Sequence, residues 1–468
     1  MVKGRNSAEQ NIIEKVYDAG QGHVFRFWDE FSDKEKDLLI EDLKQCDFEL
    51  LEKVFKVSLR KKPKIRNVST PDIIKIPKSA KDYKREKRAK KIGEDFIRTA
   101  SLAVFTAAGG QSSRLGLDIP KGAFPVTPIK KKSLFQVHAE KIRFVQNKYN
   151  ISIPWVIMTS ETNNEQTVKF FENNSFFGLN PEMVKIVIQG MNPAIDHYGK
   201  LILKEKYRLF MSPNGQGGIF SAMRKAGIYD WFDQMGIKEI FYFQVDNVLV
   251  KVCDPVFIGY HIENKCEMSS KCVYKDDPDE KIGVFLVEDG KVVVIEYIEI
   301  DQIKESMGDN APMFTAGNIA IHMLNVDFAR NENVTGLKLP FHLAHKKIPF
   351  IDEKGQRIEP EAPNGYKFET FIFDALRDVT RTIIMEVKRE EEFSPLKNKS
   401  GKDSPETVLR DQLKLFARWF KDAGIPVPME GGLPKYKLEV SPLFAAFEED
   451  FLEKINTNIR IESDVYIE

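Results

Sequence analysis

The chain has 468 residues, which exceeds the size at which one hydrophobic core stops growing, so we expect two or three domains. Its 70 lysine and arginine residues balance 70 aspartate and glutamate residues, which points away from nucleic acid and from an anionic membrane surface as partners. The 4 cysteines form no C-x-x-C pair, and no apolar run approaches the ~20 residues of a membrane span, so we expect a cytoplasmic protein without a disulfide framework or a structural zinc site.

Residues 1 to 100 are predicted to form a separate, helical N-terminal region. Ser32 and Glu35 have the spacing of a capping box before DKEKDLLIEDLKQ, in which leucines recur at helical spacing. The segment KDYKREKRAKKIGED is rich in lysine and arginine, which fits either an arm that binds nucleic acid or a solvated helix face. We favour the solvated face, because acidic residues are interleaved with the cations.

Between residues 101 and 385, short apolar runs alternate with helical patterns, which is typical of an α/β fold with a mainly parallel (mixed) sheet covered by helices. The apolar runs are LAVFTA, IPWVIM, VKIVIQ and EIFYFQV, and one helix is predicted through FSAMRKAGIYDWFDQM. VFLVEDGKVVVIEY alternates about Asp289 and Gly290 and predicts a β-hairpin. His342 and His345 have the spacing to share a helix face, as core or surface residues rather than metal ligands.

From residue 386 to 468 the pattern changes, and we expect a small C-terminal lobe. REEEFSPLKNKSGKDS is polar and loop-like. Ser404 followed by Pro405 predicts the N-cap and the first position of a helix. The later runs YKLEVSPLFAAF and NIRIESDVYIE are strand-like. The expected organisation is therefore a helical region at 1–100, an α/β domain at 101–385 and this lobe.

The stretch LAVFTAAGGQSSRLGLDIPK, from Leu102 to Lys121, has the order of a phosphate site. A buried strand is followed by Gly109 and Gly110, which let the backbone lie close to an anion, and then by Arg114 and Lys121 as cations. The string matches neither the P-loop nor the dinucleotide-binding motif. From these residues alone, a plain turn with two glycines and solvated cations is an equally good interpretation.

Asp246 is the strongest candidate carboxylate in the sequence. It directly follows the apolar run EIFYFQV, where an unpaired charge would be costly. Ligands of open α/β sheets lie beyond the carboxyl ends of the strands, and both Asp246 and the glycine turn occupy such ends. The two turns can therefore share one site, although a structural role for Asp246 as a turn or helix cap is the alternative.

The glycine stretch resembles the nucleotide-binding signature of the sugar-nucleotide pyrophosphorylases, uridylyltransferases that make UDP-sugars from UTP and a sugar 1-phosphate. Within that family the chain looks most like the UDP-N-acetylglucosamine pyrophosphorylases. The likeness extends through further strings that occur in the family's order and at similar spacing: MTSETNNEQT, VIQGMNPA, SPNGQGG, FQVDNVLVKVCDP, VIEYIEI, TAGNIAIH, AHKKIPF, PNGYKFE and REEEFSPLKN. The resemblance implies a Rossmann-like fold of nucleotidyltransferase type, UTP and a sugar 1-phosphate as substrates, and Mg²⁺ as cofactor.

The same resemblance implies a role for each matching residue. The residues expected to stabilise the reacting phosphates are Arg114, Lys121 and Lys397. Those expected to bind the nucleotide are Ala107, Ala108, Gly109, Gly110, Gln189, Gly215 and Asp246. Those expected to bind the sugar are Gln216, Glu296, Tyr297 and Asn318. Asp246 would also hold Mg²⁺, which prefers one or two carboxylates together with phosphate oxygens.

The chain departs from the family pattern at a few positions. Ser112 and Ser113 stand where the family has Gly-Thr, Gln216 stands where the nearest relatives have Asn, and Thr315 replaces an Asn. The last two changes fall near the expected sugar site, so glucose, galactose or N-acetylgalactosamine 1-phosphate is an alternative acceptor. A non-catalytic nucleotide-sugar sensor is the alternative from another functional class. The sequence does not indicate an oligomeric state.

Overall fold

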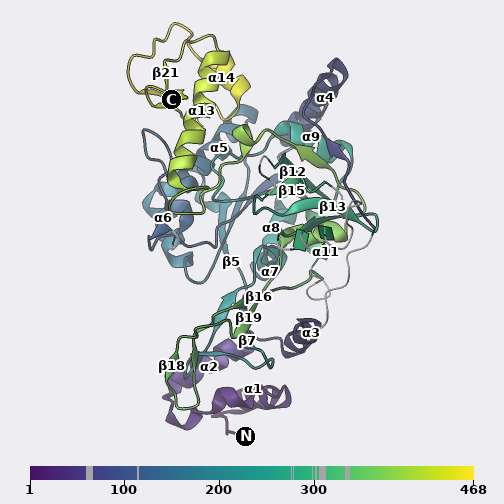
Figure 1. The fold of residues 1–468 in the computed structure, drawn as a ribbon, viewed down its shortest axis with the longest axis vertical. Coiled ribbons are helices and arrows are strands. Elements are labelled where there is room, and N and C mark those ends of the chain that lie inside the picture. Colours follow the sequence, from purple (N-terminus) through teal and green to yellow (C-terminus); the bar gives the residue numbers. More distant parts are fainter. Residues whose placement is uncertain are drawn as a thin grey trace. The chain divides into compact units, whose positions relative to one another are not determined.

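The computed structural model describes residues 1–58, 67–112, 115–275, 277, 279–297, 299–300, 303–304, 313–332 and 338–468 (Figure 1). The chain divides into two compact units, each made of three segments that are separated in the sequence. Unit 1 comprises Met1–Lys64, Gln189–Gly218 and Leu337–Asp374, whereas unit 2 comprises Ile65–Ile188, Ile219–Gly336 and Ala375–Glu468. No helix in the described ranges is both long and apolar enough to cross a lipid bilayer.

Unit 2 is built on a mixed sheet to which eleven strands of the described residues contribute. They are β1 (Val68–Ser69), β2 (Ile73–Ile74), β3 (Leu102–Ala107), β4 (Trp155–Thr159), β5 (Val184–Ile188), β11 (Glu239–Gln244), β12 (Met268–Tyr274), β13 (Val284–Glu288), β14 (Lys291–Ile295), β15 (Ala316–Asn325) and β20 (Ile384–Glu386). The main path runs β2-β20-β12-β15-β11-β3-β4-β5, and β13 pairs with β1, β14 and β15 beside it. Among the strands of this path, β15 runs antiparallel to its neighbours β11 and β12, while β11, β3, β4 and β5 are parallel.

The central strands β3 and β11 bring the two predicted turns to one edge of the sheet. Both strands are almost completely buried, because a parallel sheet covered on both faces needs apolar side chains along its whole length. Their register pairs Gln244 with Ala107, and the backbone N–H of Val245 donates to the carbonyl oxygen of Ala107 at 3.1 Å. The predicted α/β fold and the predicted strands that carry the turns are confirmed.

Helices cover the sheet of unit 2. They include α4 (Ala80–Ile97), α5 (Leu134–Tyr149), α6 (Asn164–Asn173), α7 (Ile219–Lys225), α8 (Ile228–Met235), α9 (Pro255–Glu263), α11 (Val326–Asn331), α12 (Arg389–Glu392), α13 (Pro405–Asp422) and α14 (Glu448–Lys454). Ser404 caps α13 through its side chain, and Pro405 is the first residue of that helix, as predicted. In Figure 1, α4 lies beside α9.

Two local predictions need correction. The helix predicted through FSAMRKAGIYDWFDQM is two helices, α7 and α8, because Gly227 adopts a left-handed conformation with φ of 66° between them. The segment with His342 and His345 is not a helix but strand β16 (His342–Lys346), in which His342 Nε2 lies 2.7 Å from Asp374 Oδ2. The hairpin about Asp289 and Gly290 is confirmed by the antiparallel pairing of β13 with β14.

Unit 1 combines N-terminal helices with short sheets. Its helices α1 (Ser7–Asp18), α2 (Asp33–Lys44) and α3 (Phe48–Ser58) precede a three-stranded sheet of β16, β19 (Gly365–Glu369) and β7 (Ile195–Asp196). Smaller pairs are β6 (Met191–Pro193) with β10 (Met211–Pro213), β8 (Leu203–Glu205) with β9 (Arg208–Leu209), and β17 (Phe350–Ile351) with β18 (Arg357–Ile358). The capping box of Ser32 and Glu35 begins α2 as predicted.

The final strands belong to unit 2. β23 (Leu438–Val440) pairs in parallel with β24 (Val465–Ile467), which confirms that both C-terminal apolar runs contain strands. Between them lies α14, which the sequence patterns did not predict.

Candidate active site

The loop after β3 turns its carbonyl oxygens toward one side. Asn163 Nδ2 donates to the carbonyl oxygens of Ala108 at 2.8 Å and Gly110 at 3.2 Å, and Ser160 Oγ donates to that of Gly109 at 2.9 Å. Among the described residues, the N–H groups of Gly109 and Gly110 have no hydrogen-bond acceptor. Backbone donors left open in this way suit an anion such as a phosphate group.

Lys121 and Asp246 meet beside this loop. The backbone N–H of Lys121 donates to the carbonyl oxygen of Gly110 at 3.2 Å, and Lys121 Nζ lies 3.4 Å from Asp246 Oδ2. The two side chains are only 17% and 10% exposed, so their charges are weakly screened by water. The structure therefore brings the side chains of Lys121 and Asp246 together beside the loop that follows β3.

The segment that carries Lys397 is fixed to the Asp246 turn. The N–H of Leu396 donates to the carbonyl oxygen of Asp246 at 2.9 Å, and the N–H of Lys397 donates to that of Asp403 at 2.7 Å. Lys397 Nζ lies 4.0 Å from Asp403 Oδ2. Burial raises the pKa of Asp403, the positive charge of Lys397 opposes this, and the charge of Asp246 adds to it. Asp403 therefore lies within electrostatic range of both Lys397 and Asp246.

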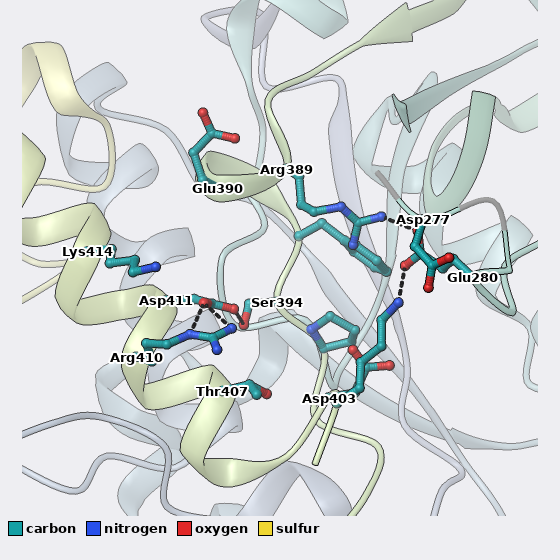
Figure 2. Close-up of a pocket in the computed structure, with 13 residues that line it drawn as sticks. Asp277, Glu280, Arg389, Glu390, Ser394, Asp403, Thr407, Arg410, Asp411 and Lys414 are labelled. Carbon is teal, nitrogen blue, oxygen red and sulfur yellow. Dashed lines mark hydrogen bonds and ion pairs between the residues drawn. The ribbon is translucent and has the colours of Figure 1, made fainter. Parts of the chain in front are cut away.

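A cavity of about 330 Å³ borders the Lys397 segment (Figure 2). Arg410, Asp411 and Lys414 reach it from α13, and Asp277 and Glu280 approach it from the other side. Its cations and carboxylates neutralise one another in pairs: Arg389 and Lys402 with Glu280, and Arg410 with Asp411. The residues that line the cavity therefore carry no net positive charge.

Two of the predicted sugar-binding residues lie together around Gly283. The N–H of Asn318 donates to the carbonyl oxygen of Gly283 at 2.8 Å, and a Cβ on Gly283 would lie 3.3 Å from Glu296 Oε1. Asn318 Oδ1 accepts from the N–H of Ala320 at 2.9 Å. Tyr297 is 40% exposed and follows Glu296 directly. The structure thus brings Glu296 and Asn318 together at the end of β14 and the start of β15.

The predicted uracil-binding turn belongs to unit 1. Gly215 has a φ of 86°, and a Cβ at this position would lie 2.4 Å from the carbonyl oxygen of Thr370, so no other residue fits without rearrangement. Thr370 also accepts from the N–H of Gly217 at 2.8 Å. The N–H of Asn214 donates to the carbonyl oxygen of Gly190 at 3.0 Å, which holds the residue after Gln189 beside this turn. Gln216 follows as the first residue of a short 3₁₀ helix, Gln216–Gly218.

A protein-family model described as UTP–glucose-1-phosphate uridylyltransferase matches residues 48–416, which include every candidate residue from Ala107 to Lys397. The chain belongs to this uridylyltransferase family. It is 36% identical to a probable UDP-N-acetylglucosamine pyrophosphorylase of Dictyostelium discoideum over 96% of both chains. It is also 36% identical to the UDP-N-acetylglucosamine pyrophosphorylase of Saccharomyces cerevisiae, over 87% of this chain and 90% of the yeast protein.

Solved structures of the uridylyltransferase family share the fold. The uridine diphosphate N-acetylglucosamine pyrophosphorylase of Trypanosoma brucei superposes with a TM-score of 0.82 at 28% identity, covering 100% of this chain and 99% of that one. A putative UDP-N-acetylglucosamine pyrophosphorylase of Entamoeba histolytica gives a TM-score of 0.75 at 32% identity, covering 86% of this chain and 100% of that one. The predicted resemblance and fold class are confirmed.

The residues around Asp246 have the chemistry to bind a divalent cation. Asp246 offers a carboxylate at the carboxyl end of β11, beside the open N–H groups of Gly109 and Gly110. Mg²⁺ is commonly bound by one or two carboxylates plus phosphate oxygens, so Asp246 and a nucleotide together would supply such ligands. Within the described ranges, no three His, Cys, Asp or Glu side chains gather around a possible metal position.

Two residues that hold the loop after β3, which we call the phosphate loop, were missed by sequence reasoning. Ser160 and Asn163, 1% and 0% exposed, lie in the turn between β4 and α6. Asn163 Oδ1 accepts from the N–H of Ser160 at 2.9 Å, so the pair forms one rigid support. They follow a buried strand at its carboxyl end, which is the same signal that identified Asp246.

Some of the predicted residues cannot be placed. Arg114 and Ser113 lie outside the described residues. Ser112 is fully buried, its N–H donates to the carbonyl oxygen of Ile119 at 3.1 Å, and its Oγ has no hydrogen-bond partner among the described residues. For the other candidate residues, the predicted roles in binding the nucleotide and the sugar stay predictions.

Proposed function

We propose that the protein transfers the uridylyl group of UTP to N-acetylglucosamine 1-phosphate and releases pyrophosphate. Membership of the uridylyltransferase family supports the reaction, and the names of the relatives from Dictyostelium and yeast support the sugar. The observation that carries the proposal is the grouping of two open backbone donors, at Gly109 and Gly110, with Lys121 and Asp246 at adjoining strand ends.

In the proposed reaction, an oxygen of the sugar phosphate attacks the α-phosphorus of UTP. The bond between that phosphorus and the oxygen bridging to the β-phosphate breaks, and pyrophosphate leaves with the electron pair. The protein needs no nucleophile of its own for this step, so positioning and charge stabilisation carry the catalysis. The N–H groups of Gly109 and Gly110 and the ammonium of Lys121 bind the phosphate oxygens as charge moves to the leaving group.

Asp246 and Lys397 complete the charge distribution in this proposal. Mg²⁺, held by Asp246 and phosphate oxygens, would neutralise negative charge on the nucleotide when bound. Lys397 directly follows Leu396, whose N–H donates to the carbonyl oxygen of Asp246, and we assign its ammonium to the phosphates. We assign Arg114 to the phosphates by resemblance. Gln189 and Gly215 are our candidates for the uracil.

The sugar is the less constrained part of the proposal. Glu296 offers a carboxylate and Asn318 an amide, which fit hydroxyl groups and an N-acetyl group respectively. Gln216 and Tyr297 are the further candidates on the sugar side. Since Gln216 and Thr315 differ from the family pattern, the 1-phosphate of an N-acetylhexosamine other than N-acetylglucosamine is the main alternative substrate.

The test is pyrophosphate release from the purified protein with UTP, Mg²⁺ and a panel of hexose and N-acetylhexosamine 1-phosphates. We expect turnover with N-acetylglucosamine 1-phosphate to exceed that with glucose 1-phosphate, and chelation of Mg²⁺ to abolish it. Replacing UTP by ATP is the matched control for the base. Higher turnover with another sugar would reassign the substrate, and no release with any sugar would refute the proposed reaction.

A further inference from the structure

We propose that Asn247 is a positioning residue that sets the distance between Lys397 and Asp246. This inference rests on the proposed function, because it concerns how two residues of that reaction are held together. Asn247 directly follows Asp246 and is only 2% exposed. The side chain of Asn247 takes no part in the chemistry of the proposed reaction. Because buried polar groups normally make hydrogen bonds, the partners of this amide indicate its role.

The amide of Asn247 joins the Asp246 turn to the segment that leads to Lys397. Its Nδ2 donates to the carbonyl oxygen of Glu392 at 2.7 Å, and its Oδ1 accepts from the N–H of Ser394 at 3.0 Å. The backbone adds an antiparallel bridge between Asn247 and Pro395. With the bond from Leu396 to Asp246, every residue from 394 to 396 is attached to the turn.

A buried ionic group fixes the far end of the same segment. Lys271 is 0% exposed, and its Nζ lies 2.6 Å from Asp254 Oδ2 and 2.5 Å from Glu392 Oε2. Lys251 Nζ lies 2.8 Å from Glu391 Oε2. Glu392 therefore cannot move without exposing an unpaired charge to an apolar interior, which is costly. The carbonyl oxygen that Asn247 binds belongs to this immobile residue.

These contacts define what Asn247 does for Lys397. Beyond Leu396, the backbone N–H of Lys397 donates to the carbonyl oxygen of Asp403, and the lysine side chain is long and has many rotamers. The amide of Asn247 links Glu392 to Ser394. It therefore determines where the backbone places Lys397, relative to Asp246. Asn247 Oδ1 also lies 3.3 Å from the N–H of Leu249, so a purely structural role within the turn is the competing explanation.

A double-mutant cycle separates these two explanations. We expect Asn247→Ala to lower kcat at least tenfold while the affinity for UMP, measured by calorimetry, changes less than twofold. In a Lys397→Ala background the same substitution should lower kcat less than twofold, because the lysine that it positions is absent. Equal losses in the two backgrounds, or an unchanged kcat for Asn247→Ala, would overturn the inference.

Two further variants guard against misfolding. Asn247→Asp keeps the side-chain volume and the acceptor for Ser394 but removes the donor to Glu392, and it should show the same dependence on Lys397. Asn325→Ala is the matched control, because Asn325 also bonds backbone groups in unit 2 but lies in β15 opposite Glu239, where β11 begins. It should leave kcat unchanged.

Hydrogen exchange tests the link between Asn247 and residues 394–396 independently of the reaction. The N–H groups of Ser394 and Leu396 should exchange at least tenfold faster in Asn247→Ala than in the wild type, whether or not the wild type releases pyrophosphate. Faster exchange without any wild-type turnover would refute the proposed function alone. Unchanged exchange in Asn247→Ala, together with turnover by the wild type, would refute the positioning role of Asn247 alone.

Discussion

Asp246 interacts with one cation of the protein and, in our proposal, with a second cation that arrives with the nucleotide. Lys121 Nζ stands 3.4 Å from its Oδ2, and both side chains are shielded from water. The ion pair with Lys121 holds the Asp246 carboxylate in place before substrate binds. In our proposal, both cations stabilise the negative charge of the phosphates during the in-line displacement.

We predict that Asp246→Asn lowers kcat by about 100-fold, since a ligand of the metal that stabilises the transition state is lost. The amide keeps the shape of the side chain, so the melting temperature should change little. A magnesium titration of turnover, together with direct Mn²⁺ binding in the presence of UTP, measures the effect. Asp289→Asn, in the exposed hairpin turn, is the control and should titrate like the wild type. Normal Mn²⁺ binding by Asp246→Asn would remove Asp246 from the metal site.

At the scale of elements, the turn between β4 and α6 acts as the support of the phosphate loop. Ser160 and Asn163 bind three successive carbonyl oxygens of the loop from behind. With its carbonyl oxygens held in this way, the loop presents N–H groups on the opposite side without reorganisation when an anion binds.

We predict that Asn163→Ala raises the KM for UTP more than the KM for the sugar phosphate. The buried carbonyl oxygen of Ala108 and the partly buried one of Gly110 lose their donor, and a buried acceptor left unpaired costs about 1–3 kcal/mol when no water replaces the donor. Steady-state kinetics with each substrate varied in turn measure the difference. Asn174→Ala removes an exposed amide at the end of α6 and should leave both constants unchanged. An unchanged KM for UTP in Asn163→Ala would show that the loop orients itself.

The elements that were predicted correctly are those whose signal is local. β3 and β11 are continuous apolar runs, and the hairpin has Asp289-Gly290 at its centre, so neighbouring residues alone specify them. The break at Gly227 was missed because its left-handed conformation interrupts an otherwise helical pattern. Ser160 and Asn163 were missed as loop supports because their partners lie more than fifty residues away in sequence, so neighbouring residues do not specify the contact. The strand at His342 depends on pairing with β19, which is equally non-local.

At the scale of the whole molecule, three of the described histidines are fully buried in unit 2, namely His138, His261 and His322. Burial lowers the pKa of His138 to about 3, assisted by the charge of Lys141, and burial likewise lowers the pKa of His322 to about 3. Both are therefore neutral in the fold at pH 5, whereas the unfolded chain binds protons at histidine below a pKa of 6.5. Because the unfolded state then holds more protons, stability falls as the pH falls through this range.

We predict that unit 2 loses up to about 2.7 kcal/mol of stability per pH unit below pH 6, one proton for each of the two histidines. Thermal unfolding between pH 7 and pH 5 measures the slope. The double variant His138→Gln/His322→Gln should flatten it, and His345→Gln, at an exposed position in unit 1, is the control. A slope that persists in the double variant would assign the acid sensitivity to other groups.

The segmented construction of unit 1 has a consequence for biosynthesis. Ile13 and Leu39 share a core with Leu203 and Phe368, so residues from all three segments must be present before that core can close. A ribosome adding about 5–20 residues per second takes on the order of tens of seconds to pass from residue 64 to residue 374. During that interval the apolar faces of α1 and α2 have emerged without their partners. Until β19 pairs with β7, the newly made N-terminal helices therefore stay in solution only if chaperones cover their apolar faces or if their aggregation is slow.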